Sequence, residues 1–488
     1  MRLLFPKCEI IVKNEHQGNK IKMIKAQNAR PFGLRDKIGY LFGDLGNDFT
    51  FILSSSFLLK FYTDVMHVSA AIVGVVMMAA RFLDAFTDVT MGRIADRMKP
   101  TRVGKFKPWI LRMCGPVAVT SFLIYQSSLA SAALPLRIVW LAVTYILWGS
   151  VFYTSINIPY GSMASAISHA PEDRQSLSTY RTMGSTVAGV IIGVGVPLFA
   201  YDTVTVGGVS SAVMNGPRFT LIAGVFSLLA IGSYFICYFF STERVPNEAH
   251  AGSSGGFVTL FRNALKNRAL ISIIVASVLM LFAQLTMQQM ANYVFPDYYG
   301  NTSAQSASTL AMLGSMTLSA ALAKPLARRF GKAEVGAASS LFAAAMSIYL
   351  YILRPESVWI YVLVSLAMWL GLGIFSMVSW ALITDVIDDS ELRVGVREDG
   401  SIYALYSFSR KLGQAAAAGL SGVLLSLIGY EKVAGVALPD KVLTGIYTLS
   451  TLVPAAGFLL LGLVLWFWYP LHKKRVDENV KLLRTKRG

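Results

Sequence analysis

Long apolar segments recur along nearly the whole chain of 488 residues. Each is close to the roughly 20 residues that a helix needs to cross a bilayer. Only 15% of the residues are charged, compared with about a quarter in soluble domains. We therefore predict an all-α, polytopic membrane protein. The apolar segments and the turn signals between them predict twelve transmembrane helices, at residues 37–63, 69–95, 108–129, 136–165, 174–201, 217–241, 269–296, 302–326, 332–353, 357–387, 400–428 and 441–469.

The basic residues lie mostly on alternate loops between the apolar segments. The formal net charge of +17 raises the alternative of a nucleic-acid partner, but cations on every second loop are the positive-inside pattern of membrane proteins. We therefore expect no nucleic-acid partner, a surrounding lipid bilayer, and contacts between some cations and anionic headgroups. Both termini are predicted to lie in the cytoplasm, and the protein in the cell (inner or plasma) membrane.

The predicted helices divide into two sets of six around the hydrophilic segment STERVPNEAHAGSSGG, whose composition is typical of a flexible linker. The segments ADRMKPTRVGK and ARRFGK follow corresponding helices of the two sets, and such internal repeats characterise transporters built from two rocking bundles. We predict the major facilitator fold, with two pseudo-symmetric six-helix bundles, functioning as a monomer. The predicted parts are a basic, mostly unstructured tail at 1–36 (with Met23 as an alternative start), an N-terminal bundle at 37–242, a cytoplasmic linker at 243–267, a C-terminal bundle at 268–470 and a basic cytoplasmic tail at 471–488.

The cysteines and histidines do not predict a metal site. Cys8, Cys114 and Cys237 have neither a disulfide framework nor the spacing of metal ligands. All five histidines fall outside the predicted helices. We expect no cofactor and no structural metal.

Two carboxylates in the second predicted helix are the strongest functional signal. Asp84 and Asp88 are four residues apart, so they share one helical face, and Arg81 lies near that face. A carboxylate in hydrocarbon must face the bundle interior and find a partner. Two acids that share a cation, H⁺ or Na⁺, meet that requirement, and when empty they repel each other, so that one takes up a proton. The alternative is a static ion pair with Arg81 that only orders the bundle.

Polar residues of the first and fourth predicted helices extend this candidate site. Asp48 can accept hydrogen bonds from two neighbouring hydroxyls of a sugar, or it can pair with a basic residue of another helix. In YTSINIPYGSM, Pro159 frees nearby carbonyls, and Thr154 and Asn157 share a face. These two side chains can complete an oxygen cage around a cation, or they can simply bond a neighbouring helix.

Intramembrane cations are predicted in the fifth and eleventh helices. They are Arg181, Arg410 and Lys411, and Tyr406 and Ser407 lie within a turn or so of Lys411. These cations can neutralise the acids of the other half, or they can bind a substrate carboxylate. The residues alone leave both roles open.

The seventh predicted helix carries an amide stripe. Gln284, Gln288 and Asn292 repeat at four-residue spacing and share one face. Such a stripe suits a polyhydroxylated ligand, and hydrogen bonding between helices explains it equally well.

A further set of charges is assigned to gating or to a charge network. The segment DVIDDSELRVGVREDG closes the tenth predicted helix at the cytoplasm, where its acids can pair with the basic loop after the second helix or form only a solvated cluster. The residues of this set are Arg81, Arg97, Lys105, Asp385, Asp388, Arg397 and Arg410.

Several ordered blocks carry a family resemblance over about residues 37 to 470. They are DAFTDVTMGRIADR, GKFKPWIL, TYILWG, NIPYGSM, RQSLSTYR and GVREDGSIYALYSFSRKLGQ. With these blocks the chain resembles the glycoside–pentoside–hexuronide:cation symporters of the major facilitator superfamily, in both the melibiose-permease and the glucuronide-transporter branches.

The resemblance implies roles for individual residues. Asp84, Asp88 and Thr154 match cation ligands of the melibiose-permease branch, whereas Asn157 stands where that branch has Asp and Ser407 where it has Thr. Asp48, Arg181 and Lys411 match residues that contact the sugar there, and Gly161 replaces an aromatic wall residue. The NIPYGS and SFSRKLGQ blocks look more like the glucuronide-transporter branch.

The residues and the resemblance together predict cation-coupled symport of a glycoside or small oligosaccharide by alternating access, with H⁺ or Na⁺ as the coupling cation. Within transport, the alternative is another amphiphilic substrate, such as a lysolipid or a drug. Two remote alternatives are an intramembrane aspartyl enzyme and a sugar sensor that does not transport. An enzyme is disfavoured because both acids lie on one helix and no second catalytic motif accompanies them.

Overall fold

A computed structural model describes residues 30–487 except 99, 102, 207–208, 245–266, 395–398 and 433–435. Nearly all of the predicted N-terminal tail and most of the predicted linker lie outside the described residues. Residues 32–488 form one compact unit. The bundle boundaries at 242 and 268 therefore stay predictions.

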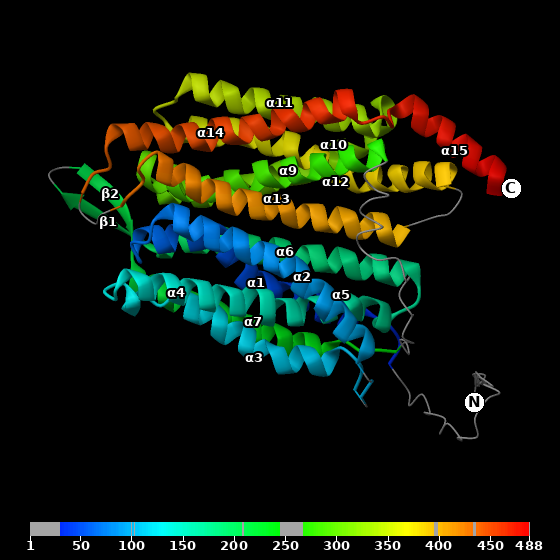
Figure 1. Ribbon diagram of the computed structural model, residues 1–488, viewed down its shortest axis with the longest axis horizontal. Helices are drawn as coiled ribbons and strands as arrows, with labels where there is room; N and C mark the ends of the chain where they lie inside the picture. Colours follow the sequence, from blue (N-terminus) through cyan, green and yellow to red (C-terminus); the bar gives the residue numbers. More distant parts are fainter. Residues whose placement is uncertain are drawn as a thin grey trace, which may run out of the picture. The chain divides into compact units, whose positions relative to one another are not determined.

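The N-terminal half contains six long helical segments and one hairpin (Figure 1). Its fourth segment is composite, because a π-helical stretch, η2, joins two α-helices. The elements are α1 (Leu34–Asp64), α2 (Ala70–Arg97), α3 (Lys107–Ile124), η1 (Ser127–Leu129), α4 (Leu134–Ile146), η2 (Leu147–Tyr153), α5 (Thr154–Ile167), α6 (Pro171–Phe199), β1 (Tyr201–Val206), β2 (Val209–Met214) and α7 (Gly216–Phe240).

The C-terminal half repeats the pattern of six long segments and ends in a further helix. Short π-helical stretches extend two of the segments. The elements are α9 (Arg268–Tyr293), η3 (Val294–Tyr298), α10 (Thr302–Phe330), α11 (Lys332–Leu353), α12 (Val358–Val394), α13 (Asp399–Leu427), α14 (Asp440–Leu463), η4 (Val464–Trp468) and α15 (Lys473–Arg487).

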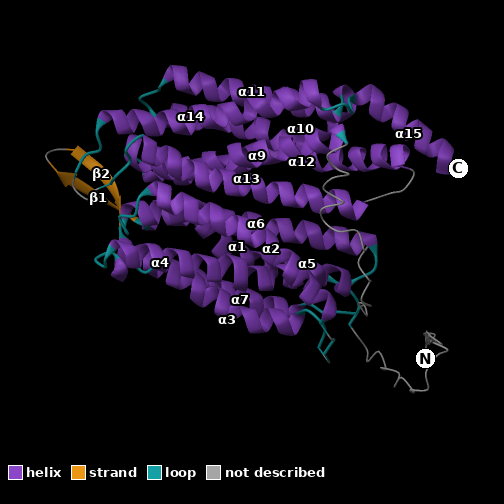
Figure 2. Cartoon of the chain, in the orientation of Figure 1, coloured by secondary structure: helices purple, strands orange, loops and turns teal. Residues whose placement is uncertain are grey.

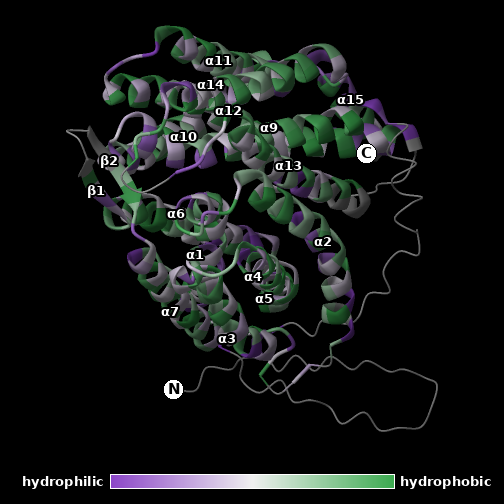
Figure 3. Cartoon of the chain, turned by 60° about the vertical axis from the view of Figure 1, so that its left-hand side comes forward, coloured by the Kyte–Doolittle hydropathy of each residue, from purple (hydrophilic) through white to green (hydrophobic). Residues whose placement is uncertain are grey.

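Each of the twelve predicted segments is helical over most of its length, which confirms the predicted all-α fold. Ten described helices are long and apolar enough to cross a membrane. The helices α1 and α13 are as long, but α1 carries the buried Lys60 and Asp44, and α13 carries Arg410 and Lys411. Large hydrophobic side chains such as Leu228 of α7 are exposed on the outer faces, and Figure 3 shows hydrophobic residues along these helices.

The sequence did not predict two elements. β1 and β2 pair antiparallel, from Tyr201 opposite Met214 to Val206 opposite Val209, and form the only strands among the described residues (Figure 2). The segment predicted only as a basic C-terminal tail forms the helix α15, whose Asn479 donates to Asp389 of α12 at 3.1 Å.

Three helix pairs join the two halves: α1 with α9, α2 with α13, and α6 with α10. The contact of α2 with α13 is a close backbone crossing, because a Cβ added at Gly422 would lie 2.3 Å from the Ala70 carbonyl oxygen and 2.8 Å from the Gly74 Cα. Between α6 and α10, the Ser306 hydroxyl donates to the Val194 carbonyl at 2.9 Å. These contacts place the polar faces of both halves toward each other.

Candidate functional site

Asp84 of α2 is held by groups from two helical segments. Its carboxylate accepts hydrogen bonds from the Arg81 guanidinium at 3.1 Å and from the Ser150 hydroxyl of η2 at 2.5 Å. Arg81 is itself buried, with its guanidinium 5.0 Å from the centre of the Phe51 ring. This geometry contains the predicted ion pair between Arg81 and Asp84.

Asp88 connects the two halves of the protein. It accepts a hydrogen bond from the Thr154 hydroxyl at 2.8 Å and forms an ion pair with Lys411 of α13. The Lys411 ammonium also lies 3.4 Å from the main-chain oxygen of Asp84. About a quarter of each side chain of this ion pair is exposed, so the pair is in contact with solvent-accessible space. The predicted acids, Thr154 and the predicted cation Lys411 thus form one constellation.

The acids of α1 form a separate group. Asp44, not Asp48, accepts a hydrogen bond from Arg181 at 2.9 Å. The Arg181 guanidinium lies 5.5 Å from the centre of the Tyr160 ring. Asp48 is half-buried one turn further along and faces Ser185 of α6.

Three other predicted residues make no hydrogen bond to Asp84 or Asp88 within the described part of the chain. Asn157 accepts a hydrogen bond from Asn47 at 3.5 Å, and Asn47 accepts one from Tyr234 at 2.8 Å. Ser407 is exposed. Tyr406 is buried, with its ring 5.3 Å from that of Trp380. Of the predicted oxygen cage, Thr154 therefore bonds Asp88, whereas Asn157 bonds Asn47.

A cavity of about 400 Å³ lies between the halves, lined by residues of α1, α6, α9, α10, α12, α13 and α14. The predicted amide stripe, Gln284, Gln288 and Asn292, lines it, together with Gln305, which the sequence analysis missed. Among its described lining residues, Arg410 is the only charged one. The cavity thus offers several amides and hydroxyls and a single positive charge.

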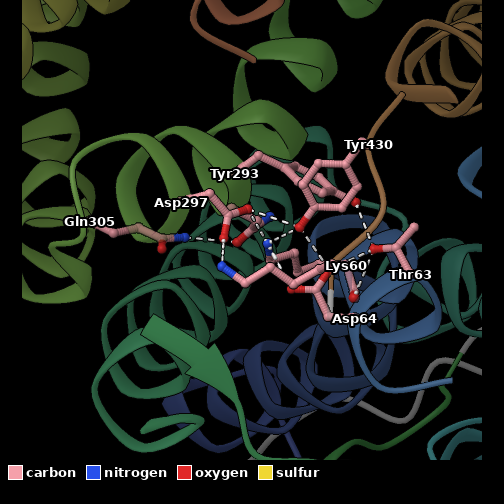
Figure 4. Close-up of polar contacts among 9 residues, drawn as sticks. Lys60, Thr63, Asp64, Tyr293, Asp297, Gln305 and Tyr430 are labelled. Carbon is pink, nitrogen blue, oxygen red and sulfur yellow. Dashed lines mark hydrogen bonds and ion pairs between the residues drawn. The ribbon is translucent and has the colours of Figure 1, made fainter. Parts of the chain in front are cut away.

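A second constellation, which the sequence analysis missed, lies at the end of the helices near the hairpin (Figure 4). The Lys60 ammonium donates to Asp297 at 2.5 Å and to Asp64 at 2.8 Å. Lys432 donates to the other Asp297 oxygen at 3.0 Å. The Tyr430 hydroxyl lies 2.8 Å from an Asp64 oxygen and 2.9 Å from an Asp297 oxygen, so its single proton can be donated to either carboxylate. We call these five residues the charged cluster.

The charged cluster joins both halves and excludes water. Lys60 and Asp64 belong to α1, Asp297 to η3, and Tyr430 and Lys432 to the segment after α13. The four charged side chains are at most 4% exposed. The strand β2 contacts both α1 and η3. This end of the protein is therefore closed.

The opposite end holds the predicted cytoplasmic part of the charge network, whereas Arg81 and Arg410 of that set lie at Asp84 and at the cavity. Asp385 pairs with Lys332, at 2.5 Å, rather than with the loop after α2. In that loop, the Lys105 amide donates to Glu243 at 2.6 Å. Arg97 is exposed. Asp388 follows within the same turn of α12 as Asp385, and Arg397 lies outside the described residues.

Helices in two sets around a polar cavity, with ion pairs that join the sets, define a membrane transporter of the major facilitator fold. Residues 39–473 match the family model described as MFS/sugar transport protein. The chain belongs to this family, the glycoside–pentoside–hexuronide type of sugar transporter, which confirms the resemblance. It is a transporter and not an enzyme.

Curated relatives match over almost the whole chain. A glucuronide carrier protein homolog of Escherichia coli (strain K12) is 30% identical, over 91% of this chain and 94% of its own length. A putative sulfoquinovose importer of Salmonella typhimurium is also 30% identical, over 91% of each chain. The crystal structure of a D-xylose-proton symporter superposes with a TM-score of 0.62 at 12% identity, over 89% of this chain and 97% of that one, which supports the fold.

Proposed function

We propose that the protein imports a sugar by cation-coupled symport, with Asp84 and Asp88 as the coupling site. The observation that carries this proposal is the ion pair between Asp88 of one half and Lys411 of the other, beside Asp84. A cation that neutralises Asp88 releases Lys411. Because Lys411 directly follows Arg410, which lines the cavity, this release changes the sugar site and the contact between the halves together.

Protons fit this site better than Na⁺. The Lys411 ammonium already occupies the position beside Asp88. A bound Na⁺ needs several oxygens to replace its hydration shell, and of the predicted helper ligands Thr154 bonds Asp88 whereas Asn157 bonds Asn47. A proton needs only one carboxylate oxygen. The proposed coupling cation is therefore H⁺.

The cavity favours a sugar that carries an acidic group. Its amides and hydroxyls match sugar hydroxyls rather than the apolar tail of a lysolipid, and Arg410 offers a partner for a carboxylate or sulfonate. Asp48 does not line the cavity, so the acid that would repel such a sugar is set apart from it. The glucuronide and sulfoquinovose named for two relatives are acidic sugars of this kind.

Alternating access assigns roles to the two ends. With the positive-inside rule, the basic loops and both termini lie in the cytoplasm, so that the charged cluster closes the outer end. The conformation described is then closed toward the outside, and transport requires the charged cluster to separate once per cycle.

The test is uptake of labelled sugars by proteoliposomes under an imposed H⁺ or Na⁺ gradient. The panel contains a glucuronide, sulfoquinovose and an uncharged glucoside. Accumulation of an acidic sugar driven by H⁺ alone is the expected result. If no gradient drives accumulation of any sugar, coupled symport is wrong; if only Na⁺ does, the choice of proton is wrong.

Replacement of Arg410 should weaken the binding of acidic sugars more than the binding of neutral sugars. Arg410→Gln removes a charge-assisted hydrogen bond, of about 1.5–3 kcal/mol, so the apparent affinity for the acidic sugar should fall about 10- to 100-fold. Arg410→Lys keeps the positive charge but not the planar guanidinium, so its apparent affinity for the acidic sugar should fall less than that of Arg410→Gln. Competition by the uncharged glucoside is the control, and an equal loss for both sugars would show that Arg410 only shapes the cavity.

A further inference from the structure

A pair of amides links the cavity wall to the first helix. The Asn292 amide of α9 donates to the main-chain oxygen of Ser56 in α1 at 2.7 Å. The Gln305 amide of α10 donates to the Asn292 side-chain oxygen, also at 2.7 Å. All three residues line the cavity. Two side chains of the C-terminal half are therefore tied to the backbone of the N-terminal half at a surface where a sugar would lie.

The helices α1 and α9 both lead to the charged cluster, because α1 carries two of its residues and α9 continues into η3, which carries Asp297. Ser56 lies one turn before Lys60 in α1, and Asn292 directly precedes Tyr293 in α9. The Lys60 ammonium lies 4.5 Å from the centre of the Tyr293 ring, and the Tyr293 hydroxyl lies 3.4 Å from that of Thr63 (Figure 4). A shift of Asn292 relative to Ser56 therefore displaces Tyr293 against Lys60.

One hydrogen-bond acceptor of the amide pair, the side-chain oxygen of Gln305, is not used within the described part of the protein. Gln305 is 6% exposed, and its side-chain oxygen has no hydrogen-bond partner among the described residues. Buried polar atoms are normally paired, so this oxygen at the cavity wall is available to a hydrogen-bond donor of a ligand. A sugar hydroxyl that donates to this oxygen, and accepts from the Asn292 amide, competes with the Ser56 carbonyl for the same donor.

We propose that Asn292 is the positioning residue through which an occupied cavity loosens the charged cluster. The inference rests on the proposed function, because it needs a sugar in the cavity. An empty cavity keeps the bond between Asn292 and Ser56, which holds α1 against α9 at the outer end. A bound sugar replaces the Ser56 carbonyl as the partner of Asn292, so the ligand interacts differently with the closed and open states, as any ligand that shifts such an equilibrium must.

The experiment follows the opening of the outer end with a single cysteine. Ser308, which lines the cavity, is replaced by cysteine in a chain whose natural cysteines are replaced by serine. A membrane-impermeant maleimide is added outside right-side-out vesicles, with and without saturating methyl glucuronide. Asn292→Ala and Gln305→Ala are compared with Asp202→Asn, which changes a residue of β1 whose side chain is more than 40% exposed and does not line the cavity.

Without sugar, Asn292→Ala should raise the labelling rate about 2- to 10-fold, the effect of one lost intramolecular hydrogen bond. The glucuronide should accelerate labelling in the parent and in Asp202→Asn, but no longer in Asn292→Ala or Gln305→Ala. An unchanged sugar response in both of these variants overturns the proposal. Uptake of the glucuronide by the parent without any change in labelling also overturns it, while leaving the proposed function intact. If the vesicles take up no sugar of the panel, the proposed function fails and this inference fails with it.

Discussion

Asp88→Asn is expected to abolish proton-driven accumulation of sugar while leaving sugar exchange measurable. The amide cannot take up a proton, and it leaves Lys411 without its ion-pair partner. Coupling free energies of 1–3 kcal/mol correspond to about 5- to 150-fold changes, so gradient-driven uptake should fall at least ~10-fold. The measurement compares uptake under an imposed gradient with exchange of labelled for unlabelled sugar across the same proteoliposomes.

Two further variants test whether a loss of accumulation in Asp88→Asn comes from the missing charge or from disturbed folding. Asp84→Asn should lose accumulation as well, because it removes the second acid of the site. In the double variant Asp88→Asn with Lys411→Gln, no unpaired ammonium remains, so the protein should recover its thermal stability but not its coupling. If Asp88→Asn accumulates sugar as strongly as the unaltered protein does, the acids of α2 are only structural.

Asp297→Asn should open the outer end. This substitution removes a carboxylate that both Lys60 and Lys432 contact. Lys60 then keeps Asp64 as its acidic partner, and Lys432 keeps no acidic partner among the described residues. Breaking a buried ion pair by removing one partner costs about 3–5 kcal/mol, which corresponds to a factor of at least about 100 in an equilibrium. Labelling of the Ser308→Cys reporter from outside should therefore rise steeply, and the purified protein should melt at a lower temperature.

The matched control lies in the hairpin of the same end. Asp202 of β1 pairs with Arg218 at 2.8 Å, but both side chains are more than 40% exposed. Exposed pairs contribute about 0–1 kcal/mol, so Asp202→Asn should change neither the labelling rate nor the melting temperature appreciably. If both variants behave alike, the charged cluster does not hold the outer end closed.

The parts of the fold that could be predicted depend on patterns local to one segment. Twelve apolar segments specify twelve helices because the bilayer allows few alternatives for so many spans. Asp84 and Asp88 stood out because they lie in the middle of an apolar run. The pairing of Asp88 with Lys411 of α13, more than 300 residues away, has no local signature and appears only in three dimensions.

The sequence analysis missed the charged cluster because its residues have no unusual local pattern. Lys60 and Asp64 lie at the end of α1, and Asp297 lies just past the end of α9, where charged residues usually face water and attract no attention. Tyr430 and Lys432 come from a loop. The sequence cannot show that these ends meet and exclude water, because their burial depends on how the two halves pack. The hairpin was missed as well, since β1 and β2 lack the strict alternation of a half-buried strand.

The contact of α2 with α13 has a mechanical consequence. Where Gly74 meets Gly422, backbone atoms touch backbone atoms, and the Met78 side chain packs against Gly419 one turn away. Since neither glycine at the crossing has a side chain, this contact suits a pivot about which one helix tilts against the other. The crossing lies near the start of α2 and the end of α13. A small rotation about it therefore displaces the opposite ends of both helices by a much larger distance. A leucine in place of Gly422 should therefore slow turnover well before it weakens the binding of sugar, which uptake measured over a range of sugar concentrations would show.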